Sequence, residues 1–331
     1  MPFSSVVGHA SLIALLKKAV LGKRVPQSLL FAGPDGVGKR TVAVALAQAI
    51  NCSKPTADGD ACGTCGACVR IAKGQYPDVV VVDKGGEASI KIQALRTRVL
   101  DAVGYRPFEG ARRVFIIDQA EAMTDQAQDA LLKTLEEPPS AAILILVSAF
   151  PDMLLATIRS RCRRVRFAPL SERDVERVLI GTTKMDPAAA RSRSAASGGS
   201  VSRALTVEED EFEEDRRAAL GLIAAAARGG VGGRLQAATA FAKHAAKRRS
   251  REAATARVAI LVSLLRDLAT LSAARAVPLA NTDLGGELTP LVAAYPLERV
   301  SSAMDVLAEA QVALGRNASP KIVADWLAVS L

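Results

Sequence analysis

A glycine-rich loop between an apolar run and a helical pattern most constrains the fold of this chain. The apolar residues 29–32 lead into Gly33-Pro34-Asp35-Gly36-Val37-Gly38-Lys39, and a helical pattern follows from Thr41 to about Ile50. This order predicts a phosphate-binding loop of the Walker A type, in which backbone amides, the helix N-terminus and a lysine hold phosphate oxygens. The alternative is a glycine-rich turn without nucleotide. The candidate phosphate-binding residues are Gly33, Gly36, Gly38 and Lys39.

The residue after the lysine departs from the Walker A pattern. A serine or threonine hydroxyl normally binds Mg²⁺ there, but this chain has Arg40, and Thr41 comes one residue later. One residue on a helix is a rotation of about 100°, so Thr41 does not simply substitute. A guanidinium group has no lone pair for a metal. We therefore expect a degenerate nucleotide site, and the residues leave open whether ATP and Mg²⁺ bind in it.

Alternating apolar runs and helical patterns predict an α/β domain over residues 1–168. Continuous apolar runs suit strands that are buried on both faces of a parallel sheet. After residue 168 the strand signal fades, which predicts a small helical lid over 169–207 and an all-helical domain over 208–331. The runs are 29–32, 79–82, 114–117 and 143–147, and the intervening helical patterns are 41–50, 90–103 and 124–136.

A second phosphate-site strand is expected at Val114 to Ile117. Asp118 ends this run, as the metal-holding aspartate of a Walker B strand does. The next residue is Gln119 rather than the glutamate that would activate water, and an amide does not take a proton near pH 7. Glu121 lies too far round to replace that glutamate. The alternative is that Asp118 is only a turn residue. Arg40 and Gln119 together predict little or no hydrolysis.

Four of the five cysteines lie close together in the sequence. Cys52, Cys62, Cys65 and Cys68 include two adjacent C-x2-C steps, and four thiolates suit a tetrahedral, structural Zn²⁺. A redox-active C-x2-C pair is the alternative, but it leaves two of these cysteines unexplained. Cys162 stands apart and is expected to serve packing. The sequence shows neither a secretory signal nor a membrane span, so we expect a cytoplasmic location with reduced thiols.

Charge is unevenly distributed along this basic chain. Lys and Arg number 43 against 34 Asp and Glu, a net charge of +9, and a string from Arg159 to Arg166 contains five arginines. The string is either a basic surface that touches DNA phosphates or the source of an arginine finger for a neighbouring γ-phosphate. Seven acids in Glu208–Asp215 predict a linker or a solvated helix start, and Lys243–Arg251 is a second basic cluster. Few aromatic residues argue against single-strand binding by stacking.

Several strings stand out together: GPDGVGK, the four clustered cysteines, FIIDQAE, ALLKTLEEPP at Ala130–Pro139, SRC at Ser160–Cys162 and GGSVSRAL at Gly198–Leu205. Together they resemble one protein family, the AAA+ subunits of the bacterial sliding-clamp loader within the DNA polymerase III holoenzyme. The resemblance is strong over about the first 205 residues, whereas the tail resembles the family's collar domain only in length and character. Arg40 and Gln119 resemble the delta-prime type of subunit, in which the ATPase motifs have decayed.

The resemblance implies a partner assembly and roles for particular residues. Motor (gamma/tau) and delta subunits would form a five-membered ring with this chain, and the ring would load the sliding clamp onto primer-template DNA. A subunit of this type would act as a stator with little or no ATPase of its own. Its Arg161 would complete the ATP site of a neighbouring motor. Ser148 and Arg203 would occupy the places of the first and second sensors.

Two other functions fit parts of the sequence. One is a catalytically active clamp-loader motor of the gamma/tau type. The other is a zinc-dependent DNA-binding regulator with a vestigial phosphate loop. ATP turnover by the chain alone would favour the first, and tight sequence-specific DNA binding would favour the second.

Overall fold

The computed structural model describes residues 1–228, 230–243, 250–273, 277–315 and 318–331. The chain divides into two compact units, Met1–Leu170 and Ser171–Leu331. Each unit has its own hydrophobic core, and each is described below by itself. The further division near residue 207 between a lid and a collar stays a prediction.

The first unit contains a five-stranded, entirely parallel sheet with the order β2-β3-β4-β1-β5. All four apolar runs that the sequence analysis identified form strands. A fifth strand at one edge was not predicted, because an edge strand that is half solvated needs no continuous apolar run. The strands are β1 (Ser28–Ala32), β2 (Val79–Val82), β3 (Arg113–Ile117), β4 (Ala142–Ser148) and β5 (Arg163–Arg166).

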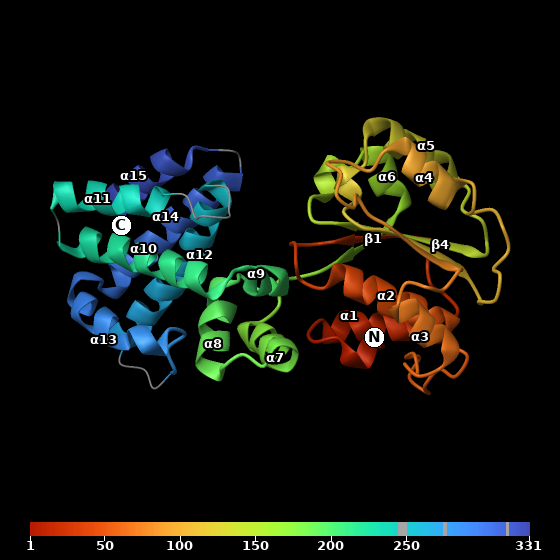
Figure 1. Ribbon diagram of the computed structural model, residues 1–331, viewed down its shortest axis with the longest axis horizontal. Coiled ribbons are helices and arrows are strands. Elements are labelled where there is room, and N and C mark those ends of the chain that lie inside the picture. The colour runs from red at the N-terminus through yellow and green to blue at the C-terminus, as the bar shows by residue number, and fades with distance from the viewer. Residues whose placement is uncertain (229, 244–249, 274–276, 316–317) are drawn as a thin grey trace. The chain divides into compact units, whose positions relative to one another are not determined.

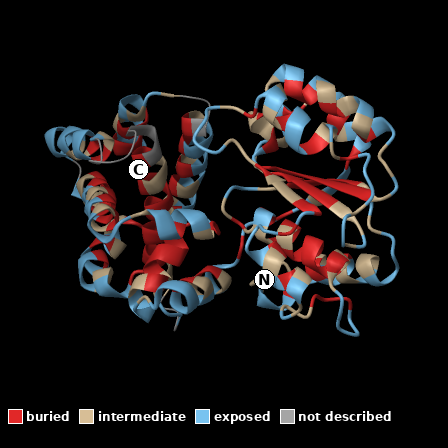
Figure 2. Ribbon diagram, turned by 45° about the vertical axis from the view of Figure 1, so that its right-hand side comes forward, coloured by how far each residue is buried: buried red, intermediate tan, exposed pale blue. Residues whose placement is uncertain are grey.

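Helices cover both faces of this sheet (Figure 1). Leu29 and Phe31 of β1 pack with the helices of one face, and Leu30 and Ala32 pack with those of the other, as the alternation of a strand requires. The three inner strands β1, β3 and β4 are therefore buried on both sides (Figure 2). One face carries α1 (Ala10–Leu21), α2 (Lys39–Asn51) and α3 (Gly66–Ala72); the other carries α4 (Ile92–Leu95), the π-helical turn η2 (Arg96–Leu100), α5 (Asp125–Glu136) and α6 (Ala156–Arg161).

Short turns complete the first unit and place its polar residues at the strand ends. The hydroxyl of Thr124 accepts a hydrogen bond from the Ala127 amide and caps α5, at the point where the sequence predicts a helix start. Successive strands end at the same sheet edge, so residues that follow β1, β2, β3 and β4 are brought together. The short 3-10 helices are η1 (Phe3–Ser5), η3 (Ala120–Ala122) and η4 (Pro151–Met153).

Every regular element among the described residues of the second unit is helical, as the sequence predicts. Apolar side chains of α10, α12, α14 and α15 dominate its core. The helices are α7 (Glu172–Thr183), α8 (Pro187–Ala196), α9 (Val201–Thr206), α10 (Glu209–Arg228), α11 (Val231–Ala242), α12 (Ser250–Ser272), η5 (Thr282–Leu284), α13 (Gly285–Leu288), η6 (Thr289–Ala294), α14 (Leu297–Gly315) and α15 (Pro320–Ser330). No helix in the described ranges is long and apolar enough to cross a bilayer.

The acidic block opens a helix. Glu209, Asp210 and Glu211 occupy the first turn of α10, where negative side chains interact favourably with the helix dipole. The expectation of a solvated face fails for Asp215, whose side chain is buried against Arg257 of α12, with 2.7 Å between Oδ1 and Nε. Residues 244–249, most of the second basic cluster, lie outside the described residues.

Candidate nucleotide site and metal centre

The glycine-rich loop connects a fully buried strand to a long helix. Strand β1 ends at Ala32, and α2 begins at Lys39. Gly36 and Gly38 have φ values of 72° and 91°, a region that side chains with a Cβ rarely adopt. A Cβ at Gly33 would collide with the carbonyl oxygen of Phe167. The three glycines of the motif are thus required by the backbone path of the loop.

Lys39 folds back onto the loop that precedes it. Its Nζ donates hydrogen bonds to the carbonyl oxygens of Gly33 at 2.8 Å and Pro34 at 2.6 Å. The side chain is buried, and desolvation lowers the pKa of its ammonium group. The lysine therefore lies inside the loop curvature, where phosphate oxygens would bind.

Arg40 pairs with acidic groups at the ends of two neighbouring strands. Its Nη1 lies 3.2 Å from Oδ2 of Asp83, which follows β2, and 3.2 Å from Oδ2 of Asp118, which follows β3. Burial raises the pKa of Asp118, while the charge of Arg40 and the Gln119 amide act in the opposite direction. A guanidinium thus holds the carboxylates that would face a divalent cation.

The other acidic and amide groups of this edge have local partners. Gln119 adopts a left-handed backbone conformation, and its amide donates to Oδ1 of Asp118 at 3.1 Å. Glu121 accepts a hydrogen bond from the Ala149 amide at 3.0 Å, at the end of β4. Its second carboxylate oxygen is buried without a hydrogen-bond partner among the described residues. The structure thus brings Glu121 to the edge, although sequence spacing argues against it as a substitute base.

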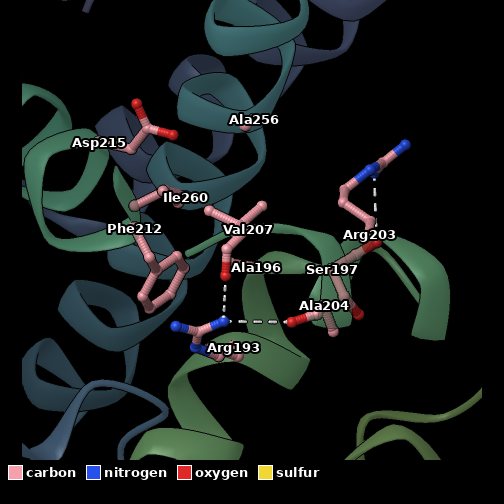
Figure 3. Close-up of a pocket in the computed structure, with 10 residues that line it drawn as sticks. All are labelled: Arg193, Ala196, Ser197, Arg203, Ala204, Val207, Phe212, Asp215, Ala256 and Ile260. Carbon is pink, nitrogen blue, oxygen red and sulfur yellow. Dashed lines mark hydrogen bonds between the residues drawn. The ribbon is translucent and has the colours of Figure 1, made fainter. Parts of the chain in front are cut away.

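The remaining sequence-predicted nucleotide residues divide between the two units. Thr41 lies in the first turn of α2, and Ser148 is buried at the end of β4, where its Oγ accepts from the Phe150 amide at 3.1 Å. Arg203 lies in the second unit on α9 and donates from Nη1 to the Ser197 carbonyl at 3.2 Å. In Figure 3 its guanidinium points away from the neighbouring Arg193 and Phe212. The roles of these residues as sensors stay predictions.

The arginine string forms the end of one helix and the edge strand. Arg161 is the last residue of α6; its Nη2 pairs with Glu136 at 2.7 Å, and its Nη1 donates to the Thr157 carbonyl at 3.0 Å. Its side chain keeps about a third of its surface exposed, at 35%. Arg159 pairs instead with Asp152. Cys162 between them is buried in the core, as expected for packing, and burial raises its pKa to about 12.

The four clustered cysteines converge at the junction of α2 and α3. Cys52 follows the last residue of α2, Cys65 directly precedes α3, and Cys68 lies within α3. The four sulfurs all lie within 4.8 Å of one another, and Cys52 and Cys65 are 4.0 Å apart. A tetrahedral Zn²⁺ with Zn–S bonds of about 2.3 Å needs sulfurs about 3.8 Å apart. The donor set therefore fits zinc.

Hydrogen-bond donors lower the pKa of two of these cysteines, Cys62 and Cys65, whereas burial raises the pKa of Cys52 and Cys68. The amides of Cys62 and Lys54 donate to the sulfur of Cys52, and the Cys65 amide donates to the sulfur of Cys62. Burial alone would raise the pKa of Cys65, but hydrogen bonds from the backbone and side chains of Cys68 and Ser53 outweigh it and lower the pKa to about 5. Amides that donate to a sulfur in this way fix the orientation of a metal ligand. Cys52, Cys62, Cys65 and Cys68 would hold Zn²⁺, which would tie the ends of α2 and α3 together.

The sequence analysis did not identify three side chains that contact the loop or the two arginines. His9 hydrogen-bonds to the Val37 carbonyl through Nε2 at 2.9 Å, with its ring against Phe167. Asp83 and Glu136 form ion pairs with Arg40 and Arg161. For Asp83, the only signal in the sequence was its position directly after the apolar run 79–82. Glu136 lies inside the string LLKTLEEPP, on which the family resemblance partly rests. The string does not indicate that Glu136 pairs with Arg161.

Comparison with known proteins agrees with this geometry. The profile of the family described as "DNA polymerase III, delta subunit" matches residues 8–171, which hold the loop, the cysteines and Arg161. This part of the chain belongs to the clamp-loader family of AAA+ proteins. The resemblance inferred from GPDGVGK, FIIDQAE and SRC is thereby confirmed at the family level.

Curated relatives match about half of this chain. DNA polymerase III subunit tau of Bacillus subtilis is 35% identical over 174 residues, or 52% of this chain and 30% of its own length. Subunit tau of Escherichia coli is 34% identical over 176 residues, or 53% of this chain and 26% of its own length. The chain thus matches about a quarter to a third of these curated relatives.

Two solved structures match this chain with low TM-scores. A gamma-subunit-related protein of DNA polymerase III from Thermotoga maritima is 19% identical, with a TM-score of 0.39 over 90% of this chain and 99% of its own. The Holliday-junction branch-migration motor RuvB of the same organism is 16% identical, with a TM-score of 0.42 over 65% of this chain and 64% of its own.

Proposed function

We propose that this chain is the delta-prime-type subunit of a DNA polymerase III clamp loader, a stator that helps load the sliding clamp onto primed DNA. The observation that carries the proposal is the bridge from Arg40 to Asp83 and Asp118. It takes up the carboxylates that a working ATPase uses to hold Mg²⁺. With Gln119 in place of a general base, the chain's own site lacks two parts of the hydrolytic machinery.

The second part of the proposal is that Arg161 acts on a neighbour. An arginine finger places a fixed positive charge beside the γ-phosphate that another subunit binds, and stabilises the charge that develops there. Arg161 stands at the exposed end of α6, and Glu136 and the Thr157 carbonyl restrict its guanidinium. Partial exposure with two restraining contacts suits a side chain that is preorganised for a partner. The partners would be motor and delta subunits in a five-membered ring.

Replacing Arg161 with alanine in the reconstituted complex tests this role. We expect the adjacent motor's ATP site to lose about 10³-fold or more in hydrolysis rate, which single-turnover measurements on the complex would detect. The matched control is Arg159→Ala, because Arg159 lies on the same short helix but pairs with Asp152. Unchanged single-turnover rates in the assembled Arg161→Ala complex would contradict the finger assignment.

A second candidate function is that of a catalytically active motor of the gamma/tau type. The observation in its favour is that the similar curated relatives carry the names tau and gamma. ATP turnover by the purified chain separates the two functions. Turnover that disappears in Lys39→Ala would establish a motor, whereas a stator shows none above background. Arg40→Thr combined with Gln119→Glu restores both missing groups. A wild type whose ATP turnover already equals that of an active double variant would also establish a motor.

A further inference from the structure

The position of Arg40 has a consequence for the ligand of the glycine-rich loop. Two carboxylates, from Asp83 after β2 and Asp118 after β3, converge on one nitrogen of one guanidinium. Neighbouring strand-end carboxylates of this kind are suitable ligands for a hard divalent cation. We propose that Arg40 takes the place of this cation, so that the loop holds the phosphates of a nucleoside di- or triphosphate without Mg²⁺.

The residues around Arg40 do not fit Mg²⁺. The ion needs near-octahedral oxygen ligands at about 2.0–2.1 Å. Position 40 supplies no hydroxyl, and the guanidinium carries only donors. A cation at Asp118 would lie against the positive charge that Asp118 already binds at 3.2 Å. The charges of Lys39, Arg40, Asp83 and Asp118 sum to zero, so these four residues are balanced without any metal.

Arg40 also retains the donors that a phosphate requires. Both of its hydrogen bonds to the carboxylates come from Nη1. Its Nη2 and Nε donate to no group among the described residues. About half of the side chain, 52%, is exposed, and it stands in the first turn of α2 directly after Lys39. A guanidinium in this position can bridge carboxylate and phosphate oxygens, as a metal does, and its planar donor array suits phosphate.

The loop supplies the rest of the phosphate site from its backbone. Gly36 and Gly38 hold left-handed conformations, which in loops of this kind let successive amides face an anion. The N-terminus of the 13-residue helix α2 adds partial positive charge. Lys39 lies beside the loop carbonyls that it would exchange for phosphate oxygens. With neither Mg²⁺ nor a general base present, the bound nucleotide would be held rather than hydrolysed.

Binding of a fluorescent ADP analogue by the full-length chain tests the inference, with excess Mg²⁺ in one series and EDTA in the other. We expect the wild-type Kd to agree within about twofold between the two series. Arg40→Thr supplies the hydroxyl of the usual motif and frees Asp118, so its binding should weaken about tenfold or more in EDTA and recover in Mg²⁺. Lys91→Thr is the charge-matched control, since Lys91 forms an exposed pair with Glu87 and should behave as wild type.

Arg40→Lys keeps the inference testable if the threonine variant does not fold. It retains a positive charge and should retain binding in EDTA, and circular dichroism checks the fold of each variant. Three results would overturn the inference: no saturable binding by the wild type, a tenfold loss of wild-type affinity in EDTA, or cation-independent binding by folded Arg40→Thr. The inference extends the proposed function but is tested apart from it, because hydrolysis at the neighbouring motor depends on Arg161 and not on the ligand of this loop.

Discussion

At the residue scale, the structure pairs individual charges that are far apart in the sequence. Asp78 shows the principle outside the candidate sites. Its buried carboxylate accepts hydrogen bonds from the amides of Phe108, Glu109 and Gly110, with Arg113 at 3.7 Å. Burial by itself would raise its pKa, but these donors and the arginine outweigh burial and lower it. One carboxylate therefore fixes the loop that leads into β3.

Asp78→Ala should lower the free energy of unfolding by about 3 kcal/mol at pH 7, because it leaves buried amides without an acceptor. The wild-type contribution is complete above the unfolded-state pKa of about 3.9 and is lost as pH falls through the lower, folded-state value. Urea denaturation between pH 7 and pH 3 measures both effects, and the variant should lose part of the acid dependence. Asp152→Ala, at an exposed ion pair, should stay within about 0.5 kcal/mol of wild type. Equal effects of the two substitutions would show that Asp78 has no special role.

At the element scale, one junction of helices depends on the cysteine cluster. The segment from Cys52 to Cys65 connects α2 to α3 without a regular element between them. Asp60 supports this connection by accepting hydrogen bonds from the amides of Phe3 and Ser4, and Lys17 pairs with it at 3.2 Å. Four converging sulfurs supply the remaining link. The geometry of this short connection therefore suits a metal that contributes to local folding.

Metal analysis of the reduced, purified chain should find about one zinc per molecule. Cys65→Ala should lose the ion, because three sulfurs and water hold structural zinc poorly. Cys162→Ala is the matched control: this cysteine is buried in the core away from the cluster, so its replacement should leave the zinc content unchanged. A reduced wild type without zinc would contradict the metal assignment and would favour the redox interpretation of the C-x2-C steps.

At the scale of the whole molecule, two units have separate cores and separate internal supports. The zinc candidate lies in the unit Met1–Leu170. The buried pair Asp215–Arg257 lies in the unit Ser171–Leu331, where Arg257 also donates to the carbonyls of Phe241 and Lys243 at the end of α11. Removing one partner of a buried ion pair typically costs about 3–5 kcal/mol, since it leaves a charge uncompensated.

Calorimetry of the full chain should therefore show two unfolding transitions that respond to different changes. Arg257→Met should lower only the unfolding temperature of the second unit. Removal of zinc with a chelator should lower only the unfolding temperature of the first unit. Arg266→Met on the same helix is the control, because Arg266 forms an exposed pair with Glu172. Its replacement should change the free energy of unfolding of either unit by no more than about 1 kcal/mol. A single transition that both changes lower together would contradict independent cores.

The amino-acid sequence by itself determined the features that depend on neighbours along the chain. The loop Gly33–Lys39 between a strand and a helix, the apolar runs of the parallel sheet and the spacing of the four cysteines are local patterns, and each is present in the folded chain. Local patterns suffice because backbone geometry and short-range packing set them. The same reasoning missed β5, since an edge strand with exposed arginines resembles a basic surface.

Only the tertiary structure decided which charges meet. Arg40 lies 43 residues from Asp83 and 78 from Asp118, Arg161 lies 25 from Glu136, and Asp215 lies 42 from Arg257. No periodicity links these positions, because the sheet order and the helix packing bring them together. A sequence can show that position 40 departs from the magnesium-binding pattern, but the strand ends of β2 and β3 determine what the arginine binds instead. Coulombic pairing acts through space, and the fold supplies the distances.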